Sequence, residues 1–160
     1  MEKNVEFEKN LPEEYSKYLD NPIIKLEKPF IDNRGGIQPI VDKLMRSAVM
    51  INSKKGSIRA NHFHKTDWHY CYVISGSIEY FHRKTGSEKE PEKILVKKGQ
   101  MVFTPPMVDH AMKFNEDTTF LTLSRNPRDQ ETYEKDVIRI NMIDNKGLIS
   151  WSPDQNEEKL

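Results

Sequence analysis

The amino-acid sequence predicts a single all-β domain built from antiparallel strands, as a sandwich or a barrel. From Ile37 to Ser124 the chain divides into short apolar runs of strand length, among them SAVMIN, WHYCYVIS, SIEYFHR, QMVFTP, HAMKF and TTFLTLS. Turn-forming segments such as SKKGS, SGS, KTGSEKEPE and PPMVD separate these runs at fairly even intervals. Many short strands with no long helix between them are typical of antiparallel β-structure.

The segments on both sides of this block have a different pattern. PEEYSKYLDN and RDQETYEKD favour short helices, DVIRINMI has strand character, and SPDQNEEKL is a polar tail. We therefore expect an N-terminal extension with a short helix over residues 1–36 and the β-barrel over residues 37–125. A C-terminal extension with a helix, a strand and a polar tail is expected over residues 126–160.

Composition excludes several classes of partner. Lys plus Arg and Asp plus Glu both number 25, so the formal net charge is zero and gives no electrostatic reason to bind nucleic acid or an anionic membrane. The single cysteine, Cys71, has no partner for an intramolecular disulfide. The N-terminal stretch MEKNVEFEKNLPEEY lacks the apolar core of a secretory signal, and no apolar run is long enough to span a bilayer. We expect a cytoplasmic protein with no nucleic-acid or membrane partner.

Three of the five histidines lie in the stretch RANHFHKTDWHYCYVISG, spaced as H-x-H-x4-H. His62 and His64 are two residues apart and share one face of a strand. A turn at KTD brings His69 back beside them, and His110 follows a Pro-Pro corner on another strand. Neutral imidazoles that converge in this way suit a divalent transition metal such as Zn, Fe, Ni or Mn, and the sequence does not distinguish between these metals.

A metal-free site that uses histidines as acid and base groups is the alternative. Four buried imidazoles need partners, since each unsatisfied polar group costs roughly 1–3 kcal/mol. Without metal, His62 and His64 would carry protons together with a tyrosine or a lysine. The residues proposed for that second role are Tyr80 and Lys113, with Glu79 and Tyr72 as further candidates.

Two segments resemble the paired signatures of the cupin superfamily. GSIRANHFHKTDWHYCYVISG is similar to the first, with Gly56, His62, His64 and Gly76 in register and His69 where the family usually has glutamate. GQMVFTPPMVDHAMKFN is similar to the second, with Gly99, Pro105 and His110 in register and Met107 in place of a glycine. The resemblance implies an antiparallel jelly-roll β-barrel, with short flanking helices, and a metal held by His62, His64, His69 and His110.

The segment PFIDNRGGIQPI ahead of the barrel is similar to one found in sugar-nucleotide cupins, which are dTDP-sugar epimerases and ketoisomerases. That resemblance implies an isomerase or epimerase acting on a carbonyl-containing sugar or sugar nucleotide. Those enzymes generally work without metal, using histidine to move protons next to a sugar ketone. Arg59 could hold a phosphate, although strict strand alternation places it on the face opposite His62 and His64.

Two other classes of function remain open. A histidine-held Fe(II) in a cavity lined by Met101, Phe103, Met112 and Phe120 would suit a dioxygenase for a small apolar or aromatic substrate. A cupin that only binds a small molecule is the third possibility. In every case the exposed edges of a small sandwich favour pairing with a second copy, so we expect a homodimer.

Overall fold

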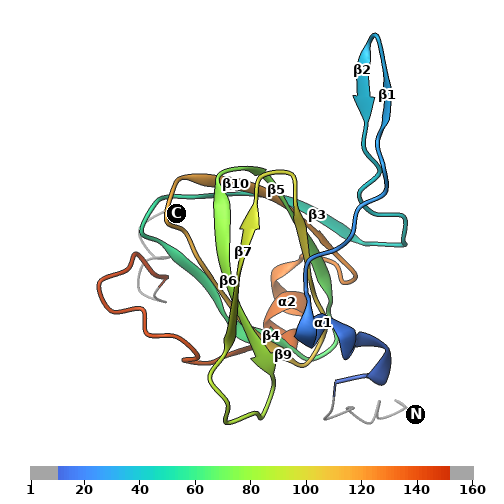
Figure 1. Cartoon of the computed structure of the whole chain (residues 1–160). Coiled ribbons are helices and arrows are strands. Elements are labelled where there is room, and N and C mark those ends of the chain that lie inside the picture. The colour runs from blue at the N-terminus through green and yellow to red at the C-terminus, as the bar shows by residue number, and fades with distance from the viewer. Residues whose placement is uncertain (1–10, 152–160) are drawn as a thin grey trace, which may run out of the picture.

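The computed structural model of the chain describes residues 11–151 (Figure 1). Two antiparallel sheets lie face to face and enclose the core, and a two-stranded hairpin stands apart from them. Within the described residues, no helix has the length and apolar character needed to cross a membrane.

The four-stranded sheet has the order β3-β10-β5-β8, and each of its pairs is antiparallel. Its strands are β3 (Ser47–Ser53), β10 (Thr118–Ser124), β5 (His69–Ser75) and β8 (Met101–Thr104). The sheet places His69 at the first position of β5.

The five-stranded sheet has the order β11-β4-β9-β6-β7 and is also antiparallel throughout. Its strands are β11 (Val137–Arg139), β4 (Ile58–His64), β9 (Val108–Lys113), β6 (Ser77–Lys84) and β7 (Glu92–Lys97). The predicted strand near the C-terminus is therefore short, and it pairs with β4 of its own chain, covering an edge that a neighbouring subunit could otherwise use.

The hydrophobic core fills the space between the two sheets. On β6 every second residue is buried, which matches the pleat of a strand that has one face in the core. Burial of each large apolar side chain stabilises the fold by about 1.5–3 kcal/mol. The core residues are Cys71, Val73, Ile78, Tyr80, Val96, Val102, Met112, Phe114 and Phe120.

The N-terminal segment covers the outer face of the four-stranded sheet. It contains a 3₁₀ turn, η1 (Glu13–Tyr15), and one helical turn, α1 (Lys17–Asp20). Tyr15 and Tyr18 pack on Phe103, at ring-centroid distances of 5.7 and 4.5 Å. Met101 and Phe103 belong to this outer cluster, so the prediction that they line an inner cavity was wrong.

The hairpin of β1 (Phe30–Asp32) and β2 (Gly35–Ile37) projects away from the body (Figure 1). Its apolar side chains are exposed: the exposed fractions are 60% for Phe30, 71% for Ile31 and 65% for Ile37. A lone two-stranded hairpin is marginally stable in water, so this arm needs something to pack against.

The predicted all-β antiparallel jelly-roll fold with short flanking helices is confirmed, with one refinement. In residues 11–151 no strand pairs with both large sheets, so the barrel is a two-sheet sandwich. The proposed division into residues 1–36, 37–125 and 126–160 stays a prediction, and its polar tail, SPDQNEEKL, lies outside the described residues.

Candidate functional site

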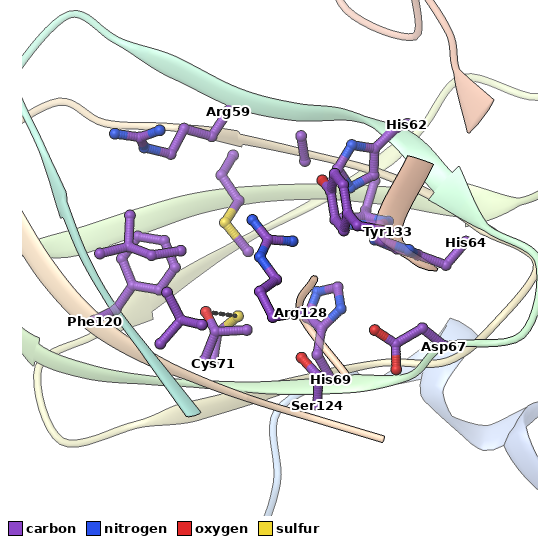
Figure 2. Close-up of a pocket in the computed structure, with 16 residues that line it drawn as sticks. Arg59, His62, His64, Asp67, His69, Cys71, Phe120, Ser124, Arg128 and Tyr133 are labelled. Carbon is purple, nitrogen blue, oxygen red and sulfur yellow. Dashed lines mark hydrogen bonds between the residues drawn. The ribbon is translucent and has the colours of Figure 1, made fainter. Parts of the chain in front are cut away.

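A cavity of about 150 Å³ opens between the two sheets (Figure 2). Both sheets contribute apolar side chains and histidines to its lining, and a largely apolar lining with a few polar groups is common in sites for small molecules. The lining residues are Val49, Ile51, Arg59, Ala60, His62, His64, Asp67, His69, Cys71, His110, Met112, Phe120, Thr122, Ser124, Arg128 and Tyr133.

Four histidines from three strands meet in this cavity. β4 supplies His62 and His64, β5 supplies His69, and β9 supplies His110. His62 pairs directly with His110 in the sheet, and its ring centroid lies 4.7 Å from both His64 and His110. His69 approaches from the four-stranded sheet, with its ring centroid 5.5 Å from His64 and 5.2 Å from His110.

Burial keeps most of these imidazoles neutral. Removal from water, reinforced by neighbouring imidazoles, lowers the pKa of His62 and of His69 well below its usual value. The same effect lowers the pKa of His110 to about 3. His110 Nδ1 donates to the carbonyl oxygen of Val108 at 2.9 Å, so in the neutral ring Nε2 holds a lone pair, and this buried atom has no hydrogen-bond partner among the described residues.

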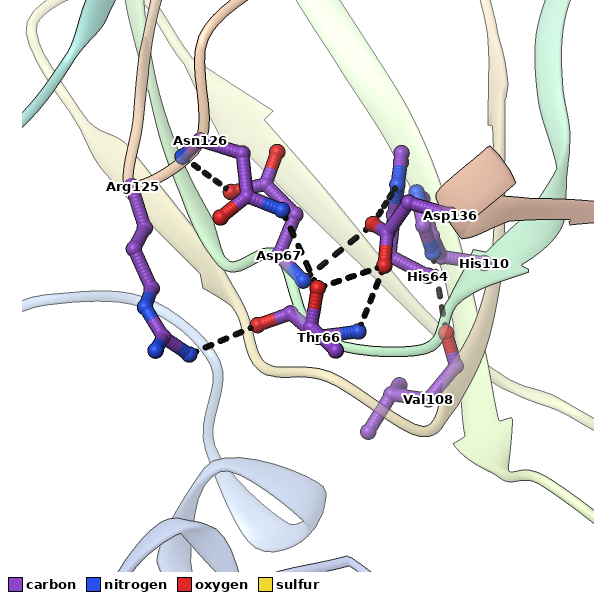
Figure 3. A network of polar contacts seen from close by, with 8 residues as sticks. All are labelled: His64, Thr66, Asp67, Val108, His110, Arg125, Asn126 and Asp136. Carbon is purple, nitrogen blue, oxygen red and sulfur yellow. Dashed lines mark hydrogen bonds and ion pairs between the residues drawn. The ribbon is translucent and has the colours of Figure 1, made fainter. Parts of the chain in front are cut away.

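His64 is oriented by a buried carboxylate, Asp136 (Figure 3). Asp136 Oδ2 lies 3.1 Å from His64 Nδ1, and Oδ1 accepts from the backbone N–H and the hydroxyl of Thr66 at 2.7 and 2.6 Å. Burial alone would raise the pKa of Asp136, but the hydrogen bonds from His64 and Thr66 outweigh it and hold the value at about 2. An ionised carboxylate only accepts, so His64 carries its proton on Nδ1 and leaves Nε2 unprotonated in the neutral ring.

A β-bulge in β4 turns Arg59 into the cavity. Ala60 and His62 pair with consecutive residues of β9, so Asn61 is an extra residue, and both Ala60 and Asn61 have left-handed φ, at 64° and 58°. The extra residue reverses the alternation of side chains along the strand. The prediction that Arg59 lies opposite His62 was therefore wrong: Arg59 lines the same cavity.

Helix α2 (Gln130–Asp136) and the turn before it supply site residues that were not expected from the sequence pattern. Tyr133 lies beside the histidines, its ring centroid 5.7 Å from that of His64. Arg128 stacks on Tyr133, with Cζ 3.9 Å from the ring centroid. Both line the cavity, and Asp136 comes from the same helix. The chain reaches this position by folding back over the cavity, which no local pattern reveals.

The structure does not bring Tyr80 or Lys113 to the cavity lining. Tyr80 is fully buried, and its hydroxyl hydrogen-bonds Thr104 Oγ1 at 2.7 Å. Burial raises the pKa of Tyr80, which makes it a poor proton donor. Lys113 is the last residue of β9 and pairs with Glu79 of β6, three residues along the strand from His110. Strand alternation alone does not predict whether these two side chains reach the cavity, because Tyr80 lies in the middle of the core and Lys113 lies at the end of a strand.

The donor set of the cluster fits a transition metal. One nitrogen from each of His62, His64 and His110 lies within 4.8 Å of the others, close enough for the three to share one ion. The unpartnered Nε2 of His110 is the kind of buried atom that such an ion would satisfy, and the carboxylate behind His64 is a common support for a metal-bound imidazole. His69 lies beside these three histidines but is not one of the residues whose ligand atoms all lie within 4.8 Å of one another.

Several solved structures share the fold. The dTDP-4-dehydrorhamnose 3,5-epimerase from Sulfolobus tokodaii superposes with a TM-score of 0.64 at 18% identity, covering 84% of this chain and 93% of the epimerase. The 3,4-ketoisomerase QdtA from Thermoanaerobacterium thermosaccharolyticum, a double mutant in complex with TDP, gives 0.60 at 26% identity over 73% and 85%. A single mutant of that ketoisomerase in complex with TDP-4-keto-6-deoxyglucose gives 0.59 at 21% identity over the same shares.

The sequence comparisons give one negative and one positive result. No curated protein matches the chain in sequence. The model of the Cupin family matches residues 38–145, which include both histidine-bearing signatures and Tyr133. This match spans more than half of the chain and agrees with the fold and with the position of the histidines between the sheets. The chain therefore belongs to the cupin family.

Proposed function

We propose that the protein is an isomerase or epimerase that acts on a carbonyl-containing sugar or sugar nucleotide. The observation that carries the proposal is the buried His64–Asp136 pair, which turns an unprotonated imidazole nitrogen away from the carboxylate in a cavity that two arginines also line. The likeness to a TDP-bound 3,4-ketoisomerase and to a 3,5-epimerase supports this choice of substrate.

The reaction begins when a histidine takes a proton from the carbon next to the sugar carbonyl. His64 is oriented for this by Asp136, which stabilises the imidazolium that forms, and His62 lies in ring contact with it. Return of a proton to the other face, or to the neighbouring carbon, gives the epimer or the isomer. Tyr133 is the phenol on the cavity wall beside both histidines and takes the role first considered for Tyr80 and Lys113.

Arg59 is placed to hold a phosphate of the substrate. Its Nε donates to Ser53 Oγ at 2.7 Å and one terminal nitrogen donates to the carbonyl of Asn52 at 2.9 Å. These bonds fix the guanidinium and leave other N–H donors for an anion, for which its planar fork is well suited.

A divalent transition metal, with Zn, Fe, Ni and Mn as the candidates, is proposed for His62, His64 and His110, with His69 close by. Such an ion would polarise the carbonyl when bound. Elemental analysis of protein purified without chelator is expected to find close to one metal per chain, and little in a variant with His62→Ala and His64→Ala. A metal content that ignores these substitutions would favour the metal-free reaction.

We also propose a homodimer in which the β1–β2 hairpin packs on a second copy. The exposed Phe30, Ile31 and Ile37 are apolar surface that a partner would cover, and the second copy offers the symmetric way to cover both arms. In such a dimer the apolar side chains of both hairpins are covered without a third chain.

Incubation with candidate substrates in D₂O tests the proposed reaction. The panel contains TDP-4-keto-6-deoxyglucose, a free keto sugar and an aromatic diol, and NMR and an oxygen electrode follow each sample. Deuterium in the position next to the carbonyl is expected, without oxygen uptake. Oxygen consumption with cleavage of the aromatic diol would instead indicate an Fe(II) dioxygenase. Binding of a sugar without exchange would indicate a protein that only binds a small molecule.

A further inference from the structure

Arg128 is a cavity residue for which neither the cupin signatures nor the sequence pattern gives a role. It lies just before α2, and its guanidinium occupies the same opening as His69 and Tyr133 (Figure 2). Stacking on the Tyr133 ring at 3.9 Å fixes the guanidinium plane, while its N–H groups point outward in that plane. Among residues 11–151 its side chain makes no hydrogen bond and no ion pair within 4 Å; its charge helps to lower the pKa of Glu134, and that carboxylate is itself paired with Arg139.

The charges around the cavity leave few groups that could stabilise an anion. The lining contains two arginines and one carboxylate, Asp67, whose Oδ1 already accepts from the backbone N–H of Asn126 at 2.9 Å. The imidazoles lie in contact with one another and are buried, so they are suited to take up a proton rather than to hold a fixed positive charge. Arg59 is bonded to Ser53 and to the backbone of β3, and its remaining N–H donors are assigned to the substrate phosphate in the proposed function. Two arginines act electrostatically on the histidine cluster: Arg128 on His69, and Arg139 on His62. Arg139 is paired with Glu134 and does not line the cavity, so Arg128 is the better placed of the two to meet an anion there.

We propose that Arg128 is a further catalytic residue, which binds the carbonyl oxygen of the substrate and stabilises the negative charge that develops there. The inference rests on the proposed function. As a histidine takes the proton, the C–H bonding pair forms a carbon–carbon double bond, and the carbonyl π-pair moves to the oxygen, which becomes an enolate beside the guanidinium. Reprotonation at carbon reverses the electron flow and frees the arginine.

Donors aimed at a developing oxyanion act mainly in the transition state. Removing one such donor typically lowers kcat by about 10²–10³. A residue that binds substrate and transition state equally would instead change KM. Arg128 should therefore show its effect in kcat, and a lysine at the same position should retain part of it, because the charge remains and the planar fork is lost.

The test compares chelator-treated wild type with Arg128→Gln, Arg128→Lys and Arg46→Gln, an exposed arginine outside the cavity lining that serves as the matched control. The first arm measures binding of oxalate, a planar dianion resembling an enediolate, by calorimetry. We expect Arg128→Gln to bind it at least about ten-fold more weakly, with Arg46→Gln unchanged. The second arm measures deuterium exchange into TDP-4-keto-6-deoxyglucose. There the kcat of Arg128→Gln should be about 10²–10³-fold lower than that of the wild type, and KM should change by no more than a few-fold in either direction.

Failure of the two proposals can be told apart. Oxalate that does not bind the wild type, or binds Arg128→Gln equally well, overturns the role of Arg128 whatever the reaction is. A raised KM with unchanged kcat also overturns it, since that result describes binding alone. If oxalate binding depends on Arg128 but the wild type exchanges no deuterium, the proposed reaction fails and the anion site at Arg128 is supported. Circular dichroism of each variant verifies that it is folded.

Discussion

Asp136 connects the fold to the chemistry at the scale of single residues. Its carboxylate accepts hydrogen bonds from His64, from the side chain and backbone of Thr66, and from the backbone of Asp67. The turn between β4 and β5 and the end of α2 are joined in this way. The same carboxylate selects the tautomer of His64, so one buried charge serves both stability and the site.

Asp136→Asn tests this double role. The amide keeps one acceptor oxygen but loses the charge, and two of the four present donors are left without a partner, because each carboxylate oxygen accepts from two of them. We expect the free energy of unfolding to fall by about 2 kcal/mol and the exchange rate by roughly 10–100-fold. Asp129→Asn is the matched control, because Asp129 is an exposed N-cap of α2 and asparagine caps equally well. Equal behaviour of the two variants in urea titrations and exchange assays would contradict the account.

The buried histidines predict an acid-sensitive protein. The folded-state pKa of His110 is lowered to about 3, so this histidine stabilises the fold above its unfolded pKa of about 6.5 and the contribution is lost as the pH falls below that value. The shifts of His62 and His69 act in the same direction. Between pH 7 and pH 5, chelator-treated protein should lose about 2 kcal/mol of unfolding free energy through His110 alone.

Urea titrations at several pH values measure this loss. His110→Gln removes one of the titrating groups, so its unfolding free energy should depend less steeply on pH than that of the wild type. Equal stability at pH 7.5 and pH 5.0 in the wild type would show that the imidazoles are not held neutral by the fold.

The residues that could be predicted from the sequence are those whose position follows from local spacing. His62 and His64 share a face because they are two apart, and His69 and His110 are each at or near the start of a strand, so all four reach the cavity. Tyr80 was a poor choice because it lies at the centre of the core, where a hydroxyl needs a buried partner and finds Thr104. Spacing alone does not say how deep in a sandwich a side chain lies.

At the scale of elements, the bulge in β4 decides which side chains face the substrate. Asn61 takes a left-handed φ there, and its side chain holds the returning C-terminal segment: Oδ1 accepts from the backbone of Met142 and Ile143, and Nδ2 donates to the carbonyl of Ile143. Asparagine tolerates this conformation better than most residues, so both functions meet in one side chain.

Asn61→Gly and Asn61→Ala separate these two functions. Glycine keeps the backbone conformation and loses the tether, whereas alanine loses the tether and adds a backbone penalty of about 1–2 kcal/mol. Both variants should be less stable than the wild type, with alanine the lower of the two, as measured by the free energy of unfolding. An alanine variant as stable as the glycine variant would show that the bulge does not depend on left-handed backbone at Asn61.

Helix α2 marks the limit of prediction at this scale. Its existence was expected from RDQETYEKD, and its bounds, Gln130–Asp136, agree with that segment. Its contribution of Tyr133 and Asp136 to the site was not expected, because it depends on where the chain travels after β10. The packing of the whole sandwich determines where such a helix lies, and the periodicity of hydrophobic residues in the sequence does not predict it.

At the scale of the whole molecule, the β1–β2 hairpin is the element whose apolar side chains remain exposed in a single chain. Ile31→Asp places a charge on a side chain that is 71% exposed in the single chain, so the substitution should hardly change the stability of a monomer. In the proposed dimer it buries an unpaired charge, and light scattering should show a mass near 18.8 kDa in place of twice that value.

Leu44→Asp is the matched control, since Leu44 is 95% exposed and lies outside the hairpin. It should leave the dimer intact. A wild-type chain that already runs as a monomer at micromolar concentration, or an Ile31→Asp variant that remains dimeric, would rule out the hairpin as the contact.

The most direct test of the proposed function is the rate at which the protein exchanges the proton next to the carbonyl of TDP-4-keto-6-deoxyglucose with D₂O. His64→Asn is compared with His82→Asn, a buried histidine that does not line the cavity. We expect exchange by the wild type and by His82→Asn, and a loss of about 10²–10⁴-fold in His64→Asn. Exchange that survives the loss of His64 undiminished, or its absence in the wild type with every keto sugar tried, would contradict the proposed function.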